Sequence, residues 1–317
     1  MNIKKITFIV CLLVTFSSLK AQSDSIPIPQ LNGHQFVING LISDPFIYTN
    51  LNFQMGVGVS AKFDAPPLPI GGFEFNVIGG SNVYANLNVG YTQRINNWAS
   101  LNFGVNMSGR IGTAPSSILT QGLNSIVGSS FGMKFKLYEG KKSIISSEFQ
   151  VKNYKVSAID VLKYIQDIIA NDSTADLTQN TNSLFGAIGI QYAYAHNDLL
   201  GFYGTAHYTF GDAVTTGESI SQFNLGLAVD INLKARTNVP LGASLGFTTR
   251  TIPEITLRSS TETILYNFKL LYTGREDIQL GLSIQYFKNQ IEIENVTLPK
   301  EITSKVTNFA FTMGYFF

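Results

Sequence analysis

The stretch Ala99-Ser100-Leu101-Asn102-Phe103-Gly104-Val105-Asn106-Met107 alternates strictly between two kinds of residue. Its odd positions are apolar, and its even positions are serine, asparagine or glycine. A period of two places the two sets of side chains on opposite faces of a β-strand. Residues 83–91 have the same phase. The two stretches therefore predict a β-hairpin, turned at Asn96-Asn97, with one apolar face and one polar face.

The same alternation recurs along the whole chain, and its connections alternate in length. Short turns and long loops that follow each other in this way are typical of transmembrane β-barrels. An even number of strands also puts both chain ends on the short-turn side. We therefore expect an all-β fold, a closed antiparallel transmembrane β-barrel of about twelve strands, with fourteen as the alternative. The strands are predicted at about 53–63, 82–95, 98–111, 129–138, 143–155, 184–194, 199–210, 220–234, 241–250, 261–273, 278–287 and 304–317.

The composition narrows the class of protein. Only 14% of the 317 residues are charged and the formal net charge is +1, whereas soluble domains have about 25% charged residues. This excludes a nucleic-acid binder held by a basic field. Three scattered histidines and a single cysteine also exclude a disulfide scaffold and a transition-metal site. We expect no metal and no cofactor.

Residues 1–21 have the features of a secretory signal peptide. Lys4 and Lys5 precede an apolar run from residue 6 to residue 16, and Ala21 offers a small residue at the cleavage site. The run is too short to span a bilayer. This segment holds the only cysteine, three of the 22 basic residues and no acid. The mature chain would then have 19 basic and 21 acidic residues, a net charge of −2, arranged as a leader or luminal plug (22–52) and a barrel (53–317).

The last strand carries a C-terminal pattern of its own. Counting back in twos, its apolar and aromatic residues are Phe317, Tyr315, Met313, Phe311 and Phe309. A terminal strand of this kind resembles the assembly signal of Gram-negative outer-membrane barrels. The resemblance implies a multi-pass protein of the cell outer membrane. Its partners would be outer-membrane lipid and, during biogenesis, the barrel-assembly machinery.

Two stretches break the period of two. Residues 157–171 space their apolar residues by three and four, with Ser157 and Asp160 as a capping box, and predict an amphipathic helix in a long loop. A weaker helix is predicted over residues 116–127 in the preceding long loop. The helices are interpreted either as a lid on the barrel mouth or as the frame of an apolar ligand-binding groove. In the second case the groove residues are Ile159, Leu162, Ile165 and Ile169.

This layout resembles the FadL-like transporters of hydrophobic compounds, which have helices in outer loops and an N-terminal segment in the lumen. The resemblance implies passive transport of small, hydrophobic or amphipathic molecules. The size and layout also resemble the PorP/SprF-like secretion-associated barrels. That resemblance implies the alternative function, an accessory barrel of a secretion or assembly machine without transport activity.

The inward-facing positions carry more bases than acids. A cationic wall would favour anions in a water-filled pore, which indicates a general or anion-preferring porin as a further alternative. The other interpretation is that these charges sit at strand ends and face water or headgroups. Several inward positions are glycine, which leaves room for a plug or a substrate. The predicted pore-lining residues are Arg94, Arg110, Lys134, Glu148, Lys152, Asp230 and Lys269.

Catalysis is not expected. Barrel lipases place their catalytic residues on the outer wall, whereas His207 faces inward in this phasing, and no serine motif accompanies it. We therefore predict no catalytic residues, no enzyme activity and no nucleic-acid partner. The ligand, if there is one, is a small molecule.

Overall fold

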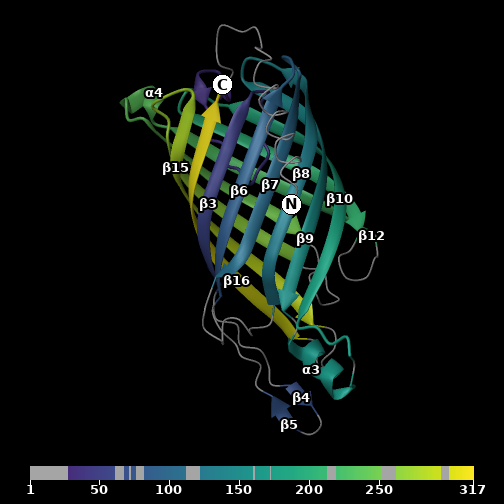
Figure 1. Cartoon of the computed structure of the whole chain (residues 1–317). Coiled ribbons are helices and arrows are strands. Elements are labelled where there is room, and N and C mark those ends of the chain that lie inside the picture. Colours follow the sequence, from purple (N-terminus) through teal and green to yellow (C-terminus); the bar gives the residue numbers. More distant parts are fainter. Residues whose placement is uncertain are drawn as a thin grey trace, which may run out of the picture.

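The computed structural model describes residues 28–60, 68–70, 73–75, 82–111, 122–159, 161–171, 173–212, 219–251, 262–293 and 300–317. The predicted signal peptide (1–21), leader residues 22–27 and residues 112–121 lie outside the described residues. Within the described ranges, twelve strands close into a barrel in which every strand is antiparallel to its neighbours (Figure 1). The predicted fold class is confirmed, with twelve strands rather than fourteen.

The barrel strands follow one another around the wall in chain order, and the last pairs with the first. Phe311 lies opposite Met55 in that closing pair. Closure satisfies the backbone groups that an open edge would leave unpaired in lipid. The strands are β3 (Asn50–Ser60), β6 (Val83–Arg94), β7 (Ala99–Ile111), β8 (Gly122–Glu139), β9 (Ser143–Ile159), β10 (Thr178–Ala195), β11 (Leu200–Asp212), β12 (Ser219–Asn232), β13 (Leu241–Thr251), β14 (Glu262–Tyr272), β15 (Ile278–Ile293) and β16 (Lys300–Phe316).

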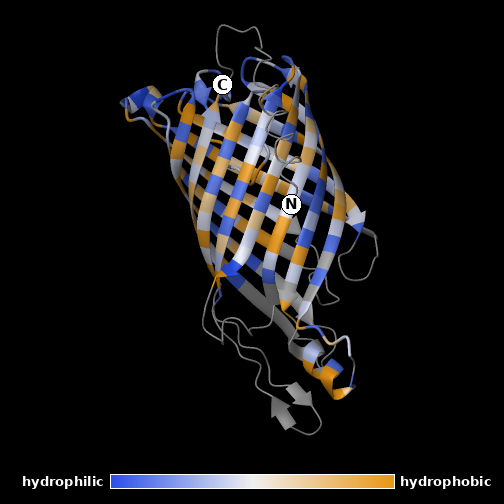
Figure 2. Ribbon diagram, viewed as in Figure 1, coloured by the Kyte–Doolittle hydropathy of each residue, from blue (hydrophilic) through white to orange (hydrophobic). Residues whose placement is uncertain are grey.

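Hydropathy alternates along the described strands of the barrel wall (Figure 2), and many large apolar side chains are exposed on its outer surface. Met55, Leu227 and Leu282 are more than half exposed on this surface. Four residues of the predicted assembly strand, Phe309, Phe311, Tyr315 and Phe317, are 41–57% exposed on it. Apolar side chains turned outward from a closed wall are suited to lipid. The molecule therefore has the architecture of an outer-membrane β-barrel.

Helices contribute little to the described part of the chain, and none there is long and apolar enough to cross a membrane. The helix α3 runs from Val161 to Ile169, and α4 (Lys234–Thr237) occupies one of the predicted short turns. Helix α3 lies at the long-loop end of the barrel, and α4 lies with the C-terminus at the short-turn end (Figure 1).

The amphipathic helix predicted within residues 157–171 is confirmed as α3, but its predicted start and the second helix prediction need correction. Residues 122–127 belong to β8, so the helix predicted over 116–127 is wrong there, and its remainder lies outside the described residues. Ser157 lies in β9, where it pairs with Asn180 of β10, so it is not a helix cap. Ile159 is the last residue of the same strand and does not belong to the helix. The reason is length. Strands β8, β9 and β10 have 18, 17 and 18 residues, and about 9–11 span the apolar layer, so pairing continues into the loops.

Two short strand pairs in the described part of the chain lie outside the barrel wall. Strands β4 (Leu68–Ile70) and β5 (Phe73–Phe75) pair with each other as a hairpin. Residues 73–75 therefore do not extend β6, although they share its phase. Strands β1 (Gln30–Leu31) and β2 (His34–Gln35) form a second hairpin near the N-terminus of the described chain.

Candidate functional site

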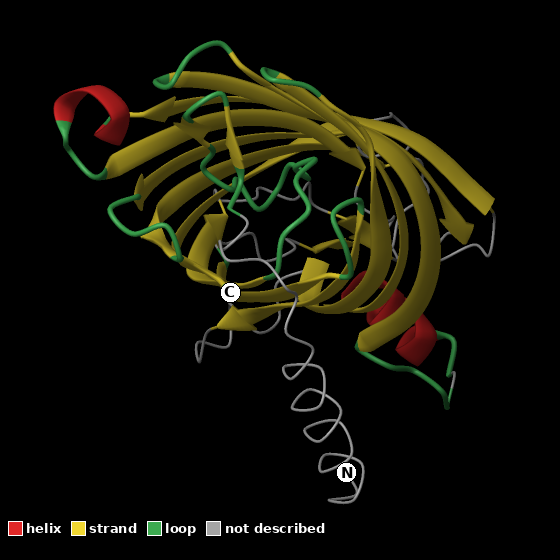
Figure 3. Cartoon of the chain, turned by 90° about the horizontal axis from the view of Figure 1, so that it is seen from above, coloured by secondary structure: helices red, strands yellow, loops and turns green. Residues whose placement is uncertain are grey.

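Residues 28–49, the luminal segment, precede the first barrel strand and lie inside the barrel. Seen from above, loop segments occupy the space within the ring of strands (Figure 3). The segment begins with the β1–β2 hairpin, which turns at Asn32 and Gly33, both with positive φ. His34 Nδ1 lies 3.1 Å from the backbone oxygen of Asp198, in the short turn between β10 and β11. The hairpin therefore sits at the short-turn end of the barrel.

The luminal segment and the wall share one apolar core. Phe36 packs edge-on against Tyr203 of β11 with ring centroids 6.1 Å apart, and Tyr48 packs against Phe316 of β16 at 5.4 Å. Burial of such side chains stabilises by roughly 1.5–3 kcal/mol each. The segment is thus packed as part of the folded barrel. Its core side chains are Leu31, Phe36, Ile38, Ile42, Phe46 and Tyr48.

Wall side chains hold the backbone of residues 36–38. Asp230 Oδ2 accepts a hydrogen bond from the Val37 amide at 2.8 Å, and Lys269 Nζ donates to the Ile38 carbonyl at 2.5 Å. Gln279 donates to the Phe36 carbonyl at 3.0 Å, and the Tyr203 hydroxyl donates to the Val37 carbonyl at 3.2 Å. Backbone groups that could not reach water are therefore satisfied by the barrel wall.

Glycines in the wall make room for the luminal segment. A Cβ atom at Gly242 would lie 2.7 Å from Val37 Cγ2, and one at Gly246 would lie 2.9 Å from both Asn39 Nδ2 and Ile42 Cδ1. Real Cβ atoms do not approach so closely. The absence of side chains on this part of β13 is therefore what allows the segment to lie against the strand.

A second anchor holds the far end of the luminal segment. Lys134 Nζ on β8 donates to the backbone oxygen of Asp44 and lies 3.5 Å from Asp44 Oδ1. Asp44 also accepts from the Tyr48 hydroxyl at 2.6 Å and from the Phe46 amide at 3.0 Å. Nearby, Ser146 donates to the Pro45 carbonyl at 2.5 Å. The buried Asp44 carboxylate is thus paired with a buried cation.

Replacing Lys134 by methionine is expected to loosen the luminal segment without unfolding the barrel. The change leaves the Asp44 carboxylate buried without its cation, which costs about 3–5 kcal/mol in such pairs. We expect backbone amides of residues 36–49 to exchange hydrogen on the order of a hundredfold faster, measured by mass spectrometry. The matched control is Lys152→Met, which changes an inward lysine farther along β9. Equal exchange in the two variants would contradict this role of Lys134.

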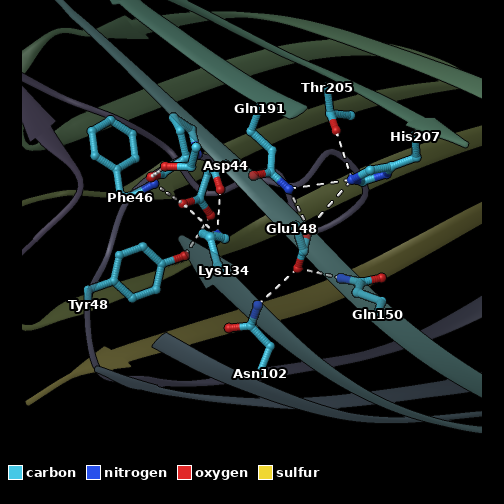
Figure 4. Close-up of polar contacts among 12 residues, drawn as sticks. Asp44, Phe46, Tyr48, Asn102, Lys134, Glu148, Gln150, Gln191, Thr205 and His207 are labelled. Atoms are coloured by element: carbon cyan, nitrogen blue, oxygen red, sulfur yellow. Dashed lines mark hydrogen bonds and ion pairs between the residues drawn. The ribbon is translucent and has the colours of Figure 1, made fainter. Parts of the chain in front are cut away.

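Glu148 is the centre of a polar cluster next to this anchor (Figure 4). Its Oε1 accepts from Asn102 at 2.9 Å and from Gln150 at 2.5 Å. Its Oε2 accepts from Gln191 and lies 3.5 Å from His207 Nε2. The carboxylate is almost fully buried, and donors on β7, β9, β10 and β11 compensate its desolvation. The cluster therefore ties five neighbouring strands together, because Lys134 of β8 lies beside Glu148 in register.

The geometry of this cluster does not suit nucleophilic catalysis. Thr205 Oγ1 lies 3.2 Å from His207 Nε2, the same nitrogen that faces Glu148 and Gln191. A triad needs the nucleophile and the acid on opposite ring nitrogens. The described residues also contain no group of three or more potential metal ligands.

The predicted pore-lining residues fall into two groups. Lys134, Glu148, Asp230 and Lys269 are buried around the luminal segment or beside its anchor. The other three are only partly buried. The Arg94 guanidinium binds the short turn through the backbone oxygen of Asn96 at 3.4 Å, and its amide donates to Oγ1 of Thr49, the last residue of the luminal segment, at 3.1 Å. Arg110 pairs in register with Tyr84 near the long-loop end of β7, and Lys152 lies farther along β9. A pore-lining role remains a prediction for all seven.

The predicted groove residues are not brought together on one helix. Ile159 is buried in β9. On α3, Ile165 is half-buried and Ile169 is 62% exposed, and the Leu162 side chain lies outside the described part. The ligand groove therefore remains a prediction.

Sequence reasoning missed the residues of the segment and wall that meet inside the barrel, chiefly Asp44, Tyr48, Tyr203 and Gln279. Asp230 and Lys269 were the predicted residues that could have indicated a segment packed inside the barrel. Both occupy inward positions near the short-turn ends of their strands, where a water-filled pore and a packed segment give the same alternation.

No protein-family profile and no curated protein matches the sequence. The fold is similar to solved outer-membrane barrels. A FadL homologue of Pseudomonas aeruginosa is 8% identical at a TM-score of 0.45, with 92% of this chain and 97% of that one covered. The toluene transporter TodX of P. putida is 10% identical at 0.42, over 92% and 98%. A KdgM porin in complex with oligogalacturonate is 9% identical at 0.43, over 84% and 99%. Likeness at this level assigns no substrate to this chain.

Proposed function

We propose that the chain is a passive outer-membrane channel that its own luminal segment closes at the periplasmic end. Short turns face the periplasm in bacterial barrels, so the segment would lie on that side. The observation that carries the proposal is burial. Asp230, Gln191 and Ser244 face inward beside the segment or its anchor and are 0–1% exposed, as polar wall residues of an open pore would not be.

The other half of the lumen remains wet. Asn86, Asn106, Gln150 and Lys152 also face inward, but they are only partly buried. A closed wall separates them from lipid, so solvent reaches them from inside the barrel. Solutes would therefore enter from the long-loop side and meet the luminal segment as the barrier.

Release of the segment must break its polar anchors, each about 1 kcal/mol between neutral groups and about 1.5–3 kcal/mol to a charged group, and must expose its apolar core, so the closed state predominates without a solute. The segment continues directly into β3 at Asn50. It can leave the lumen toward the periplasm while the barrel stays closed. A solute that competes for the wall contacts would shift this equilibrium by its differential affinity.

Deletion of residues 28–45 tests the proposal. Wild-type protein in planar lipid bilayers should show rare, brief openings, and the deletion variant should show a large, steady ionic current. Circular dichroism of both proteins checks that the barrel has formed. A deletion variant that folds but carries no current would contradict the channel proposal and favour the accessory-barrel alternative.

The substrate class does not follow from the loop helices. The expectation of a hydrophobic substrate depended on an apolar groove between two helices, and in the described part only α3 is present as a helix of that kind. Ile168 and Ile169 of α3 are at least half exposed, without a described partner helix opposite them. The lumen itself is the better guide.

A further inference from the structure

Three amides form a directed chain across the wall in the wet half of the lumen. Asn86 of β6 donates to Asn308 of β16 at 3.0 Å, and Asn308 donates to Gln285 of β15 at 2.9 Å. The chain passes over β3 at Gly58, where an added Cβ would lie 3.4 Å from Asn86 Nδ2. A glycine at this position therefore allows side chains from strands on either side of β3 to meet.

One end of the amide chain is available to a ligand. Asn86 is only partly buried, and its Oδ1 makes no hydrogen bond to the described residues. Asn308 and Gln285 are 4% and 3% exposed and support Asn86 from behind. Because Asn86 is already oriented by Asn308, its free acceptor is pre-organised for binding.

More amides face the same space. Asn88 of β6, Asn106 of β7 and Gln150 of β9 point inward and are partly buried, and Gln150 is fixed by its bond to Glu148. On the other side of Gln150, the rings of Tyr154 and Phe185 lie 6.2 Å apart on β9 and β10. Amides and ring faces therefore share this part of the wall.

The charged side chains in this half of the lumen do not determine which ligand it suits. Lys152 and Arg110 are cationic, and Arg110 already interacts with another group. The buried Glu148 carboxylate accepts from Asn102, Gln150 and Gln191 and lies 3.5 Å from His207 Nε2. Neutral amides outnumber these charges. An amide donates and accepts, and so does a hydroxyl, whereas an alkyl ligand would dehydrate these amides without replacing their hydrogen bonds.

We propose that this half of the lumen, between the luminal segment and the long loops, binds neutral polyhydroxylated solutes such as saccharides. The inference rests on the proposed function and names its substrate class. Recognition would come from the hydroxyls pairing with Asn86 and with the partly buried amides Asn88, Asn106 and Gln150. Binding in this half does not require the channel to open.

Binding of maltose to the intact wild-type chain tests the inference. Saturation-transfer difference NMR is measured in a detergent without a sugar headgroup, with sodium gluconate as the anionic competitor probe. We expect weak binding of maltose. The double variant Asn86→Leu/Asn308→Leu should weaken it at least about tenfold, since two oriented amides are lost. The matched control is Asn52→Leu, an inward amide of β3 at the short-turn end, and it should bind maltose as wild type does.

Each outcome decides something. No maltose signal with the wild type, or equal binding by the wild type and the folded double variant, would overturn the inference. Stronger binding of gluconate than of maltose would assign the lumen to anions and overturn it as well. The bilayer currents of the deletion variant are independent of these results, so the saccharide inference can fail while the channel proposal stands.

Discussion

Leucines at Gly242 and Gly246 are expected to turn the closed barrel into a permanently open one. Each leucine would place its side chain where the luminal segment now lies, because even a Cβ at these positions meets Val37, Asn39 or Ile42 within 3 Å. Overpacking of this kind costs about 1–3 kcal/mol per site. It would also separate Asp230, Lys269 and Gln279 from the segment backbone. We expect a steady ionic current in planar bilayers, approaching that of the segment-deleted barrel.

Gly90→Leu is the matched control for the leucine variants. Gly90 faces inward on β6, but its nearest neighbour is Asn52 Cβ at 3.7 Å from an added Cβ, so a side chain there has more room. This variant should keep the brief wild-type openings. If Gly242→Leu/Gly246→Leu folds and its current equals that of Gly90→Leu, the wall glycines do not seat a closing segment.

The period of two predicted the barrel because a strand in a membrane wall has one face in contact with lipid and one face turned to the lumen. Every strand must present apolar residues to the bilayer, so the alternation in residues 99–107 reports directly on which face is outside. The twelve strands and their antiparallel order were predictable for this reason. The lipid-facing residues of the last strand, such as Phe309 and Phe311, were predictable on the same basis.

Beyond the bilayer this constraint ends. The predicted start of the helix that became α3, and the helix predicted over residues 116–127, were wrong there. Residues 122–127 and Ser157 lie where β8 and β9 extend past the apolar layer. Neither face of the sheet meets lipid at that level, so apolar residues need not alternate. Strand pairing continues through the backbone, which leaves no trace in the side-chain pattern.

The path of the luminal segment could not be predicted for a related reason. Side chains of the wall hydrogen-bond to residues 36–38 mainly at their backbone carbonyls and amides. Backbone groups are the same in every residue, so the segment carries little sequence record of its partners. Asp44, Asn39 and His34 do contact the wall through their side chains. A single carboxylate, amide or imidazole in a leader does not indicate which wall residue it will meet.

A reducible disulfide between the luminal segment and the wall should hold the channel shut. An added Cβ at Gly242 lies 2.7 Å from Val37 Cγ2, which places the two Cβ atoms within about 4 Å, inside the range that disulfides adopt. The only native cysteine is Cys11, in the predicted signal peptide. The variant Val37→Cys/Gly242→Cys would therefore form one bond. We expect its openings to disappear when it is oxidised and to reappear after reduction, at the frequency that the double variant shows when it has never been oxidised.

The disulfide distinguishes opening by movement of the luminal segment from opening by movement of the long loops. If the long loops opened the channel, a bond between Val37→Cys and Gly242→Cys would leave the current unchanged, since both residues lie at the short-turn end. The single variant Gly242→Cys controls for the added side chain and should not respond to reductant. Mass spectrometry shows whether the bond has formed, by the loss of two hydrogens. Openings in a fully oxidised double variant would mean that the segment stays in place while solutes pass, and the closing role proposed for it would be wrong.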